Sequence, residues 1–337
     1  RPRSNAPSPE RYGAGAPPLP PPAPPLCGRP PQAWKISTLR LSSFRRRALS
    51  ALALTLPLVG GAALAGAATA SAADIVAPPA ELALDPFYTQ ALQTDGVWIT
   101  SSSKVKPSTL VKARNMVHAM LAHRPEIARE LVRQGFRIAI MAEDETTMDL
   151  PEQRDWDKPA RDDIVLTPFE RENYDTEIAP LTPYEYWAKR ARGMGGLLTS
   201  GAEENIQAVP GTRYFGETIL VHEFSHAMYQ ALLEIDPAFD ALIHAAYANA
   251  RQRGTWKDQY MENTIDEYWA EGTQFWFNSN FPAQMGDTLV RTDAEMAARD
   301  PALAVLLEQV YGPIHRLPDD PFWMHNAKAK PRTAKAD

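Results

Sequence analysis

The stretch that decides the fold is residues 218–235, with the sequence TILVHEFSHAMYQALLEI. Apolar residues lie on nearly every side of a helix built from this stretch, so the sequence predicts a helix buried all round. The same stretch contains His222, Glu223 and His226. Polar groups inside a protein are costly unless they find partners, so these three side chains predict a bound ion in the core.

Residues 222–226 read H-E-F-S-H, an H-E-x-x-H pattern. Residues four apart lie on one face of a helix, so His222 and His226 can bind the same ion. Glu223 is rotated by about 100° from His222 and would lie beside the ion, where it can take a proton from activated water. Because Cys27 is the only cysteine, histidine and carboxylate ligands are expected, and they suit one zinc ion per chain. The alternative is that both histidines are core residues and Glu223 pairs with an arginine.

A catalytic zinc site needs a third protein ligand, and here it must be a carboxylate. Leu232 stands where a third histidine would complete a longer pattern. The best candidates lie in residues 263–271, NTIDEYWAE, which predict a second helix with Asn263 as its N-cap. Glu267 and Glu271 are four apart and share a face of this helix among aromatic residues, so either could approach a cation.

Residues 222–226, Tyr260 and residues 267–271 (EYWAE) together resemble the zinc peptidase domain of the anthrax lethal factor family, a branch of the gluzincins. In that family a tyrosine precedes, by seven residues, a glutamate on a second helix, within a run of Glu, two aromatic residues, Ala and Glu. Tyr260 and Glu267 have this spacing. The resemblance is strong over about residues 215–280 and weak further towards the N-terminus.

The resemblance implies that Glu267 is the third zinc ligand and that Tyr260 donates a hydrogen bond to the oxyanion of the tetrahedral intermediate. It also implies that Glu271 orients a ligand histidine from behind, and Asp266 is predicted to belong to the same supporting layer. The binding and translocation portions of the toxin have no counterpart in this sequence. A toxin role is therefore not implied.

The rest of the sequence predicts an α+β fold. We expect a zincin-like arrangement, with a small mixed sheet in an N-terminal lobe, a helical C-terminal lobe, and the H-E-x-x-H helix at the cleft between them. Gly195 and Gly196 are expected in a loop or at a strand edge that aligns the backbone of a substrate. The predicted helices are 110–121, a helix opened by Pro125, 184–192, 218–235, 237–252 and 264–278, and the predicted strands are 136–141 and 163–166.

The N-terminal region predicts export rather than a folded domain. Residues 1–40 are proline-rich, and we interpret them as disordered or as a mis-called upstream segment. Residues 41–73 combine an arginine cluster, an apolar run and small residues, as an export signal peptide does. A membrane anchor is less favoured, because prolines and glycines interrupt the run and its apolar part is shorter than roughly 20 residues. Residues 74–325 are then the zincin-like metallopeptidase domain, and residues 326–337 a disordered tail.

Without the signal, residues 74–337 contain 26 Lys and Arg against 40 Asp and Glu, a formal charge of −14. This charge argues against nucleic acid as a partner. We therefore expect a secreted or periplasmic zinc metallopeptidase that acts on peptide or protein substrates and keeps no membrane anchor after signal cleavage. Two alternatives stay open: a secreted, non-catalytic binding protein with the same fold, and a zinc hydrolase of a non-peptide amide such as a cell-wall component.

Overall fold

The computed structural model describes residues 71–330, except residues 164, 165 and 167. The proline-rich segment 1–40 and nearly all of the predicted signal peptide 41–73 lie outside the described residues. Of the predicted tail, only residues 326–330 are described, and the Asn326 side-chain amide donates to the backbone oxygens of Gly216 and Asn280. None of the helices in the described part of the chain combines the length and apolarity needed to cross a bilayer.

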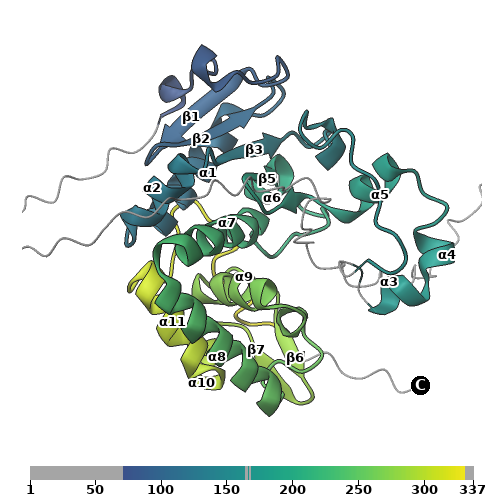
Figure 1. The fold of residues 1–337 in the computed structure, drawn as a ribbon, viewed down its shortest axis with the longest axis vertical. Coiled ribbons are helices and arrows are strands. Elements are labelled where there is room, and N and C mark those ends of the chain that lie inside the picture. Colours follow the sequence, from purple (N-terminus) through teal and green to yellow (C-terminus); the bar gives the residue numbers. More distant parts are fainter. Residues whose placement is uncertain (1–70, 164–165, 167, 331–337) are drawn as a thin grey trace, which may run out of the picture.

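A five-stranded mixed sheet forms the N-terminal half, with the strand order β1-β2-β3-β5-β4 (Figure 1). Strands β2, β3 and β5 run parallel, whereas β1 and β4 pair antiparallel at the two edges. Together with the helices, this sheet confirms the predicted α+β class. The strands are β1 (Gln90–Thr94), β2 (Val97–Ser101), β3 (Arg137–Met141), β4 (Gly193–Met194) and β5 (Leu198–Ala202).

Strands β1 and β2 form a hairpin that the sequence analysis missed. Thr94 pairs with Val97, so Asp95 and Gly96 alone make the turn. Both turn residues have positive φ, 52° and 85°, as a type I′ turn requires. Aspartate followed by glycine is among the sequences that favour this turn, so the signal was present in the sequence.

Three helices pack against one another and against the sheet. Helices α1 (Pro107–Leu121) and α2 (Pro125–Arg133) make the crossover from β2 to β3, and each begins with proline, whose missing N–H costs nothing at that position. Both contact α7 (Ile219–Ile235), which also lies against β5. A predicted strand over residues 163–166 is partly outside the described residues, and its described residues 163 and 166 are not in a strand.

The C-terminal half is helical, as predicted. Figure 1 shows α7 lying between the sheet and the remaining helices, with α9 directly beneath it. Almost every residue of α7 up to Leu232 is buried, which confirms the prediction from its apolar surface. The other helices here are α8 (Pro237–Arg253), α9 (Ile265–Trp276), α10 (Asp293–Arg299) and α11 (Pro301–Tyr311), and a small hairpin joins β6 (Ala283–Met285) to β7 (Thr288–Val290).

Shorter elements connect these parts. Between β3 and β5 the chain forms α3 (Pro168–Glu172), α4 (Tyr174–Glu177) and α5 (Pro183–Arg190), and α6 (Glu203–Ile206) follows β5. The 3-10 helices are η1 (Ala72–Asp74), η2 (Ala80–Leu82), η3 (Thr147–Asp149) and η4 (Tyr260–Glu262).

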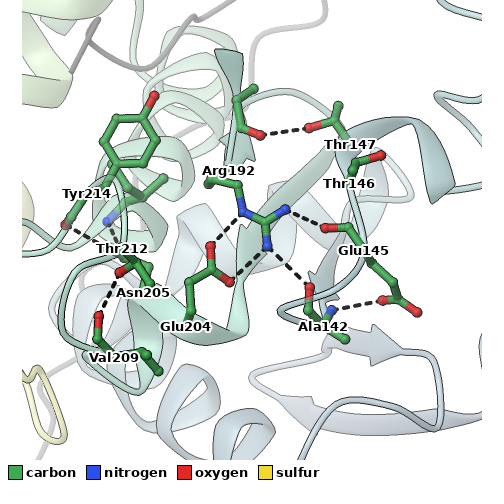
Figure 2. Close-up of polar contacts among 12 residues, drawn as sticks. Ala142, Glu145, Thr146, Thr147, Arg192, Glu204, Asn205, Val209, Thr212 and Tyr214 are labelled. Atoms are coloured by element: carbon green, nitrogen blue, oxygen red, sulfur yellow. Dashed lines mark hydrogen bonds and ion pairs between the residues drawn. The ribbon is translucent and has the colours of Figure 1, made fainter. Parts of the chain in front are cut away.

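The first turn of α7 is held by a residue from another element. Thr218 is the N-cap, but its side chain makes no capping hydrogen bond. Instead, the backbone N–H of Ile219 donates to Asn205 Oδ1 at 2.9 Å. Asn205 Nδ2 in turn donates to the backbone oxygen of Tyr214 at 3.0 Å (Figure 2). It also donates to the backbone oxygen of Glu217 at 2.9 Å. One buried side chain therefore fixes both the loop before α7 and the start of the helix.

Asn205→Ala should lower the free energy of unfolding by about 3 kcal/mol, because three buried backbone groups lose their partner. Urea denaturation measures this change. Asn249→Ala removes the same side chain from an exposed position on α8 and should change the stability by less than about 0.5 kcal/mol. Equal effects of the two substitutions would contradict the role of Asn205.

Candidate metal centre

His222, His226 and Glu267 come together in the core. The two histidines lie one turn apart on α7, and Glu267 lies in the first turn of α9. Each residue offers a ligand atom, and these atoms all lie within 4.8 Å of one another. Glu267 Oε2 is 3.1 Å from His222 Nε2 and 3.8 Å from His226 Nε2. Exposed fractions are 0% for His222 and 3% for the other two, so the cluster is almost sealed from water.

Contacts between α7 and α9 place the glutamate opposite the histidines. The Trp269 indole N–H donates to the backbone oxygen of Ser225, between the two histidines, at 3.2 Å. Thr264 is the N-cap of α9, and its side-chain oxygen accepts from the Glu267 N–H at 3.1 Å. The prediction of Asn263 as N-cap was therefore wrong by one residue, and the cap holds Glu267 directly.

The donor set fits a zinc ion. Neither ring nitrogen of His226 and neither carboxylate oxygen of Glu223 has a hydrogen-bond partner of normal geometry among the described residues. Buried polar atoms left in this way destabilise a protein unless an ion or ligand pairs with them. Two imidazoles and one carboxylate are a common ligand set for zinc that keeps one position open.

Electrostatics inside the cluster also favour a cation. Burial lowers the pKa of His226 to about 4, so its ring stays neutral and keeps a lone pair for a metal. Burial lowers the pKa of His222 too, but the hydrogen bond and charge of Glu267 outweigh it and raise this pKa. Burial alone would raise the pKa of Glu267. The two histidines outweigh burial, so this pKa is lowered. Glu267 thus favours a proton on His222, and a metal that binds the same nitrogen would displace it.

Glu223 lies beside the ligand group on α7, and its side chain comes close to the edge strand β4 and to Gly195, which follows it. Burial raises the pKa of Glu223 to about 8, against the attraction of His222. A Cβ added to Gly195 would lie 3.3 Å from Glu223 Oε2 and 3.1 Å from His226 Cβ. A Cβ at Gly193 would lie 2.5 Å from a methyl carbon of Ile219. The backbone here thus packs directly on the helix, where a side chain at Gly193 would clash and one at Gly195 would be tight.

Of the two glycines predicted to bind substrate, only Gly195 lies against the cluster. Gly196 has a φ of +130°, and a Cβ there would find its nearest neighbour, the backbone oxygen of Leu198, at 3.9 Å. This backbone conformation suits the turn between β4 and β5, so Gly196 shapes the connection.

Arg192 fixes the position of β4 (Figure 2). Its guanidinium makes two hydrogen bonds to the Glu204 carboxylate, at 2.6 and 2.8 Å. The same group donates to the backbone oxygens of Ala142 and Glu145, in the turn that follows β3. A bidentate arginine–carboxylate pair of this kind holds a rigid geometry. The strand that faces Glu223 is therefore anchored immediately before its first residue.

Tyr260 and Asp266 take different positions around Glu267. The half-buried Tyr260 hydroxyl donates to Glu267 Oε1 at 3.1 Å, so it touches the predicted ligand. Asp266 Oδ1 accepts from the Gln230 side chain at 3.1 Å, one turn beyond His226 on α7.

Glu271 lies close to His222 but does not hydrogen-bond to it. Glu271 Oε1 is 3.8 Å from His222 Nδ1, and its other oxygen accepts from Asn280 Nδ2 at 2.8 Å. Gln274 Oε1 lies 2.9 Å from His222 Nδ1 instead, and this oxygen can accept a hydrogen bond from the ring. Gln274 was not among the predicted site residues, although it lies two turns after Glu267 and so on the same face of α9.

Glu217 is a second residue that the sequence analysis missed. It is buried beside Gln274, and burial together with the charge of Glu271 raises its pKa to about 8. It precedes α7 in a loop, where no spacing rule could have connected it with the cluster.

Comparisons with known proteins found a structural neighbour. No protein-family profile and no curated protein matches it. Among solved structures, it is similar to the Pro-Pro endopeptidase PPEP-2 of Paenibacillus alvei, with 14% sequence identity and a TM-score of 0.40. That match covers 63% of this chain and 95% of the other. A TM-score of this size does not establish a shared fold, and the resemblance to the anthrax lethal factor family stays a prediction.

Zinc should stabilise the metal-free protein, by about 2.7 kcal/mol when free zinc is 100 times the Kd. Glu267→Ala should abolish this stabilisation, because two histidines alone hold zinc weakly. His118→Ala changes a histidine that is paired with Asp95 outside the cluster and should keep the full effect. Calorimetric unfolding with and without zinc, with elemental analysis after dialysis, measures both. Zinc retained by Glu267→Ala would overturn the ligand assignment.

Proposed function

We propose that this chain is an exported, zinc-dependent metallopeptidase of the gluzincin type, with a zincin-like fold and one zinc ion per chain. The observation that carries the proposal is the buried group His222, His226 and Glu267, with Glu223 beside it on the same helix. Zinc-assisted hydrolysis requires such a set: two imidazole ligands, one carboxylate ligand and a second carboxylate beside the metal as the base.

A zinc ion held by this group would supply Lewis-acid activation of water and of the scissile carbonyl. Glu223 would accept the proton of the attacking water on its carboxylate and return it to the nitrogen of the leaving amine. Because Glu223 is sealed from solvent, the proton would pass between the reacting groups rather than to bulk water.

Tyr260 would stabilise the negative charge that develops on the carbonyl oxygen. Its hydroxyl already lies at the cluster, where it donates to Glu267 Oε1. When substrate binds, the hydroxyl would turn from this carboxylate towards the substrate oxygen, whose charge grows in the transition state. The hydrogen bond to Glu267 thus keeps the Tyr260 hydroxyl close to where the substrate oxygen would bind.

Strand β4 would align the substrate. It is the last strand of the sheet, so one of its edges has no neighbouring strand within the five-stranded sheet. An extended peptide can add to such an edge through backbone hydrogen bonds. Since Gly195 lies against Glu223 and His226, a peptide paired with β4 would present its carbonyl groups beside the general base.

Export is proposed from residues 41–73 alone, whose arginine cluster, apolar run and small residues resemble a signal peptide. The mature chain would be secreted or periplasmic without a stable membrane anchor. N-terminal sequencing of material from the culture medium or periplasm should begin near residue 74. Recovery of the proline-rich segment in the exported protein would contradict this assignment.

Glu223→Gln should keep zinc and lose about 1000-fold or more in kcat/KM, because the amide cannot accept the proton. Cleavage of a peptide library, followed by mass spectrometry, measures the loss alongside zinc content. Glu308→Gln makes the same change at an exposed position on α11 and should leave both unchanged. Loss of zinc together with activity would make Glu223 a ligand. A zinc-loaded wild-type protein that cleaves only cell-wall amides, or nothing, would favour a non-peptide hydrolase or a binding protein.

Gly195→Ala should lower kcat/KM by about tenfold or more, because the added methyl presses on Glu223 and His226. Gly201→Ala is the matched control on β5, where a Cβ would meet Leu220 at an ordinary 3.5 Å. The control should retain activity within about twofold. If both variants behave alike, close approach of β4 to the helix does not matter for turnover.

A further inference from the structure

We propose that Gln274 is the residue that positions His222 as a metal ligand, by fixing which ring nitrogen carries the proton. The inference rests on the metal-binding part of the proposed function and is independent of peptide hydrolysis. It assigns to a neutral amide the supporting role that the resemblance gave to Glu271.

The direction of the Gln274 amide follows from its neighbours. The side chain is fully buried, and its Nε2 donates to the backbone oxygen of Thr218 at 3.2 Å. A backbone oxygen can only accept, so the amide nitrogen must face Thr218. The amide oxygen then faces His222 Nδ1, at 2.9 Å. His222 must donate from Nδ1, which leaves Nε2 to bind a metal beside Glu267.

The carboxylate of Glu271 cannot replace this contact as it stands. It lies 3.8 Å from the same nitrogen, beyond hydrogen-bonding distance. Asn280 Nδ2 also donates to the other carboxylate oxygen of Glu271 at 2.8 Å and to the Glu271 backbone oxygen at 3.3 Å. Glu271 therefore acts on His222 through its charge, across 3.8 Å, and not through a hydrogen bond.

The amide is itself held in place by two elements. Thr218, which accepts from Gln274, donates its hydroxyl to Asp320 Oδ1 at 2.6 Å. Asp320 accepts a further hydrogen bond from the backbone N–H of Phe322 at 3.0 Å. The C-terminal segment, the start of α7 and the last turn of α9 are thus linked through Gln274. Because α9 carries both Glu267 and Gln274, one rigid helix supplies a ligand and the support for another ligand.

The test compares three variants in the full-length protein, with zinc as the probe. Gln274→Met keeps the length of the side chain but removes the acceptor, and should weaken zinc binding 10- to 100-fold. Gln274→Glu keeps an oxygen towards Nδ1 and should restore the Kd to within about tenfold of wild type. Gln153→Met is the control, since Gln153 is also a buried glutamine, 3% exposed, but lies outside the cluster. It should change the Kd by less than about twofold.

Zinc Kd is measured by competition with a chromogenic chelator, and urea unfolding of the metal-free variants reports any general loss of stability. Nitrogen-15 NMR of zinc-loaded wild type should show a proton on His222 Nδ1 that exchanges slowly with water. This spectrum does not depend on whether a variant folds, and absence of the Nδ1 proton would overturn the proposal.

The outcomes separate this inference from the proposed function. If wild type binds zinc but Gln274→Met binds it equally well, the positioning role is wrong and the metal site stands. The same holds if Gln274→Met and Gln153→Met lose affinity in equal measure. If wild type binds no zinc, both the inference and the proposed function fail. If zinc binds with the expected order of affinities but no amide is cleaved, only the hydrolytic role fails.

Discussion

The structure depends on one constraint: a helix that is apolar on nearly every side contains two imidazoles and a carboxylate that water does not reach. Each of these groups would cost several kcal/mol in an apolar core without partners. Helix α9 supplies Glu267 to both imidazoles and Gln274 to one of them, while its aromatic residues exclude water from the same space. The close packing of α7 on α9 therefore serves charge compensation as much as hydrophobic burial.

The sheet meets this constraint from the other side. Strand β4 approaches α7 so closely that backbone takes the place usually filled by side chains. Such a contact needs a fixed strand, and Arg192 provides it through Glu204 and the turn that follows β3 (Figure 2). The ion pair lies outside the cluster, yet it determines where the backbone beside Glu223 lies.

Sequence periodicity predicted those features that depend on residues close together in one segment. The apolar surface of α7, and the spacing of His222 and His226 on one face, follow from helical periodicity. Strand β5 (LTSGA) has little to mark it as a strand, because its conformation comes from pairing with β3. The partners of Asn205 and Gln274 lie in other elements, so no periodicity reveals them. The Asp95-Gly96 turn, by contrast, was readable and was overlooked.

Gly193 in β4 and Gly195 directly after it have a consequence for finding relatives of this chain among genome sequences. Side chains cannot be introduced at Gly193 without a clash, and Gly195 leaves little space, whereas Met194 between them packs into a separate apolar cluster with Trp187. Natural selection should therefore preserve Gly-x-Gly before the helix while the central residue drifts among apolar types. A search signature that joins Gly-x-Gly to the downstream H-E-x-x-H would reject most chance occurrences of the shorter motif.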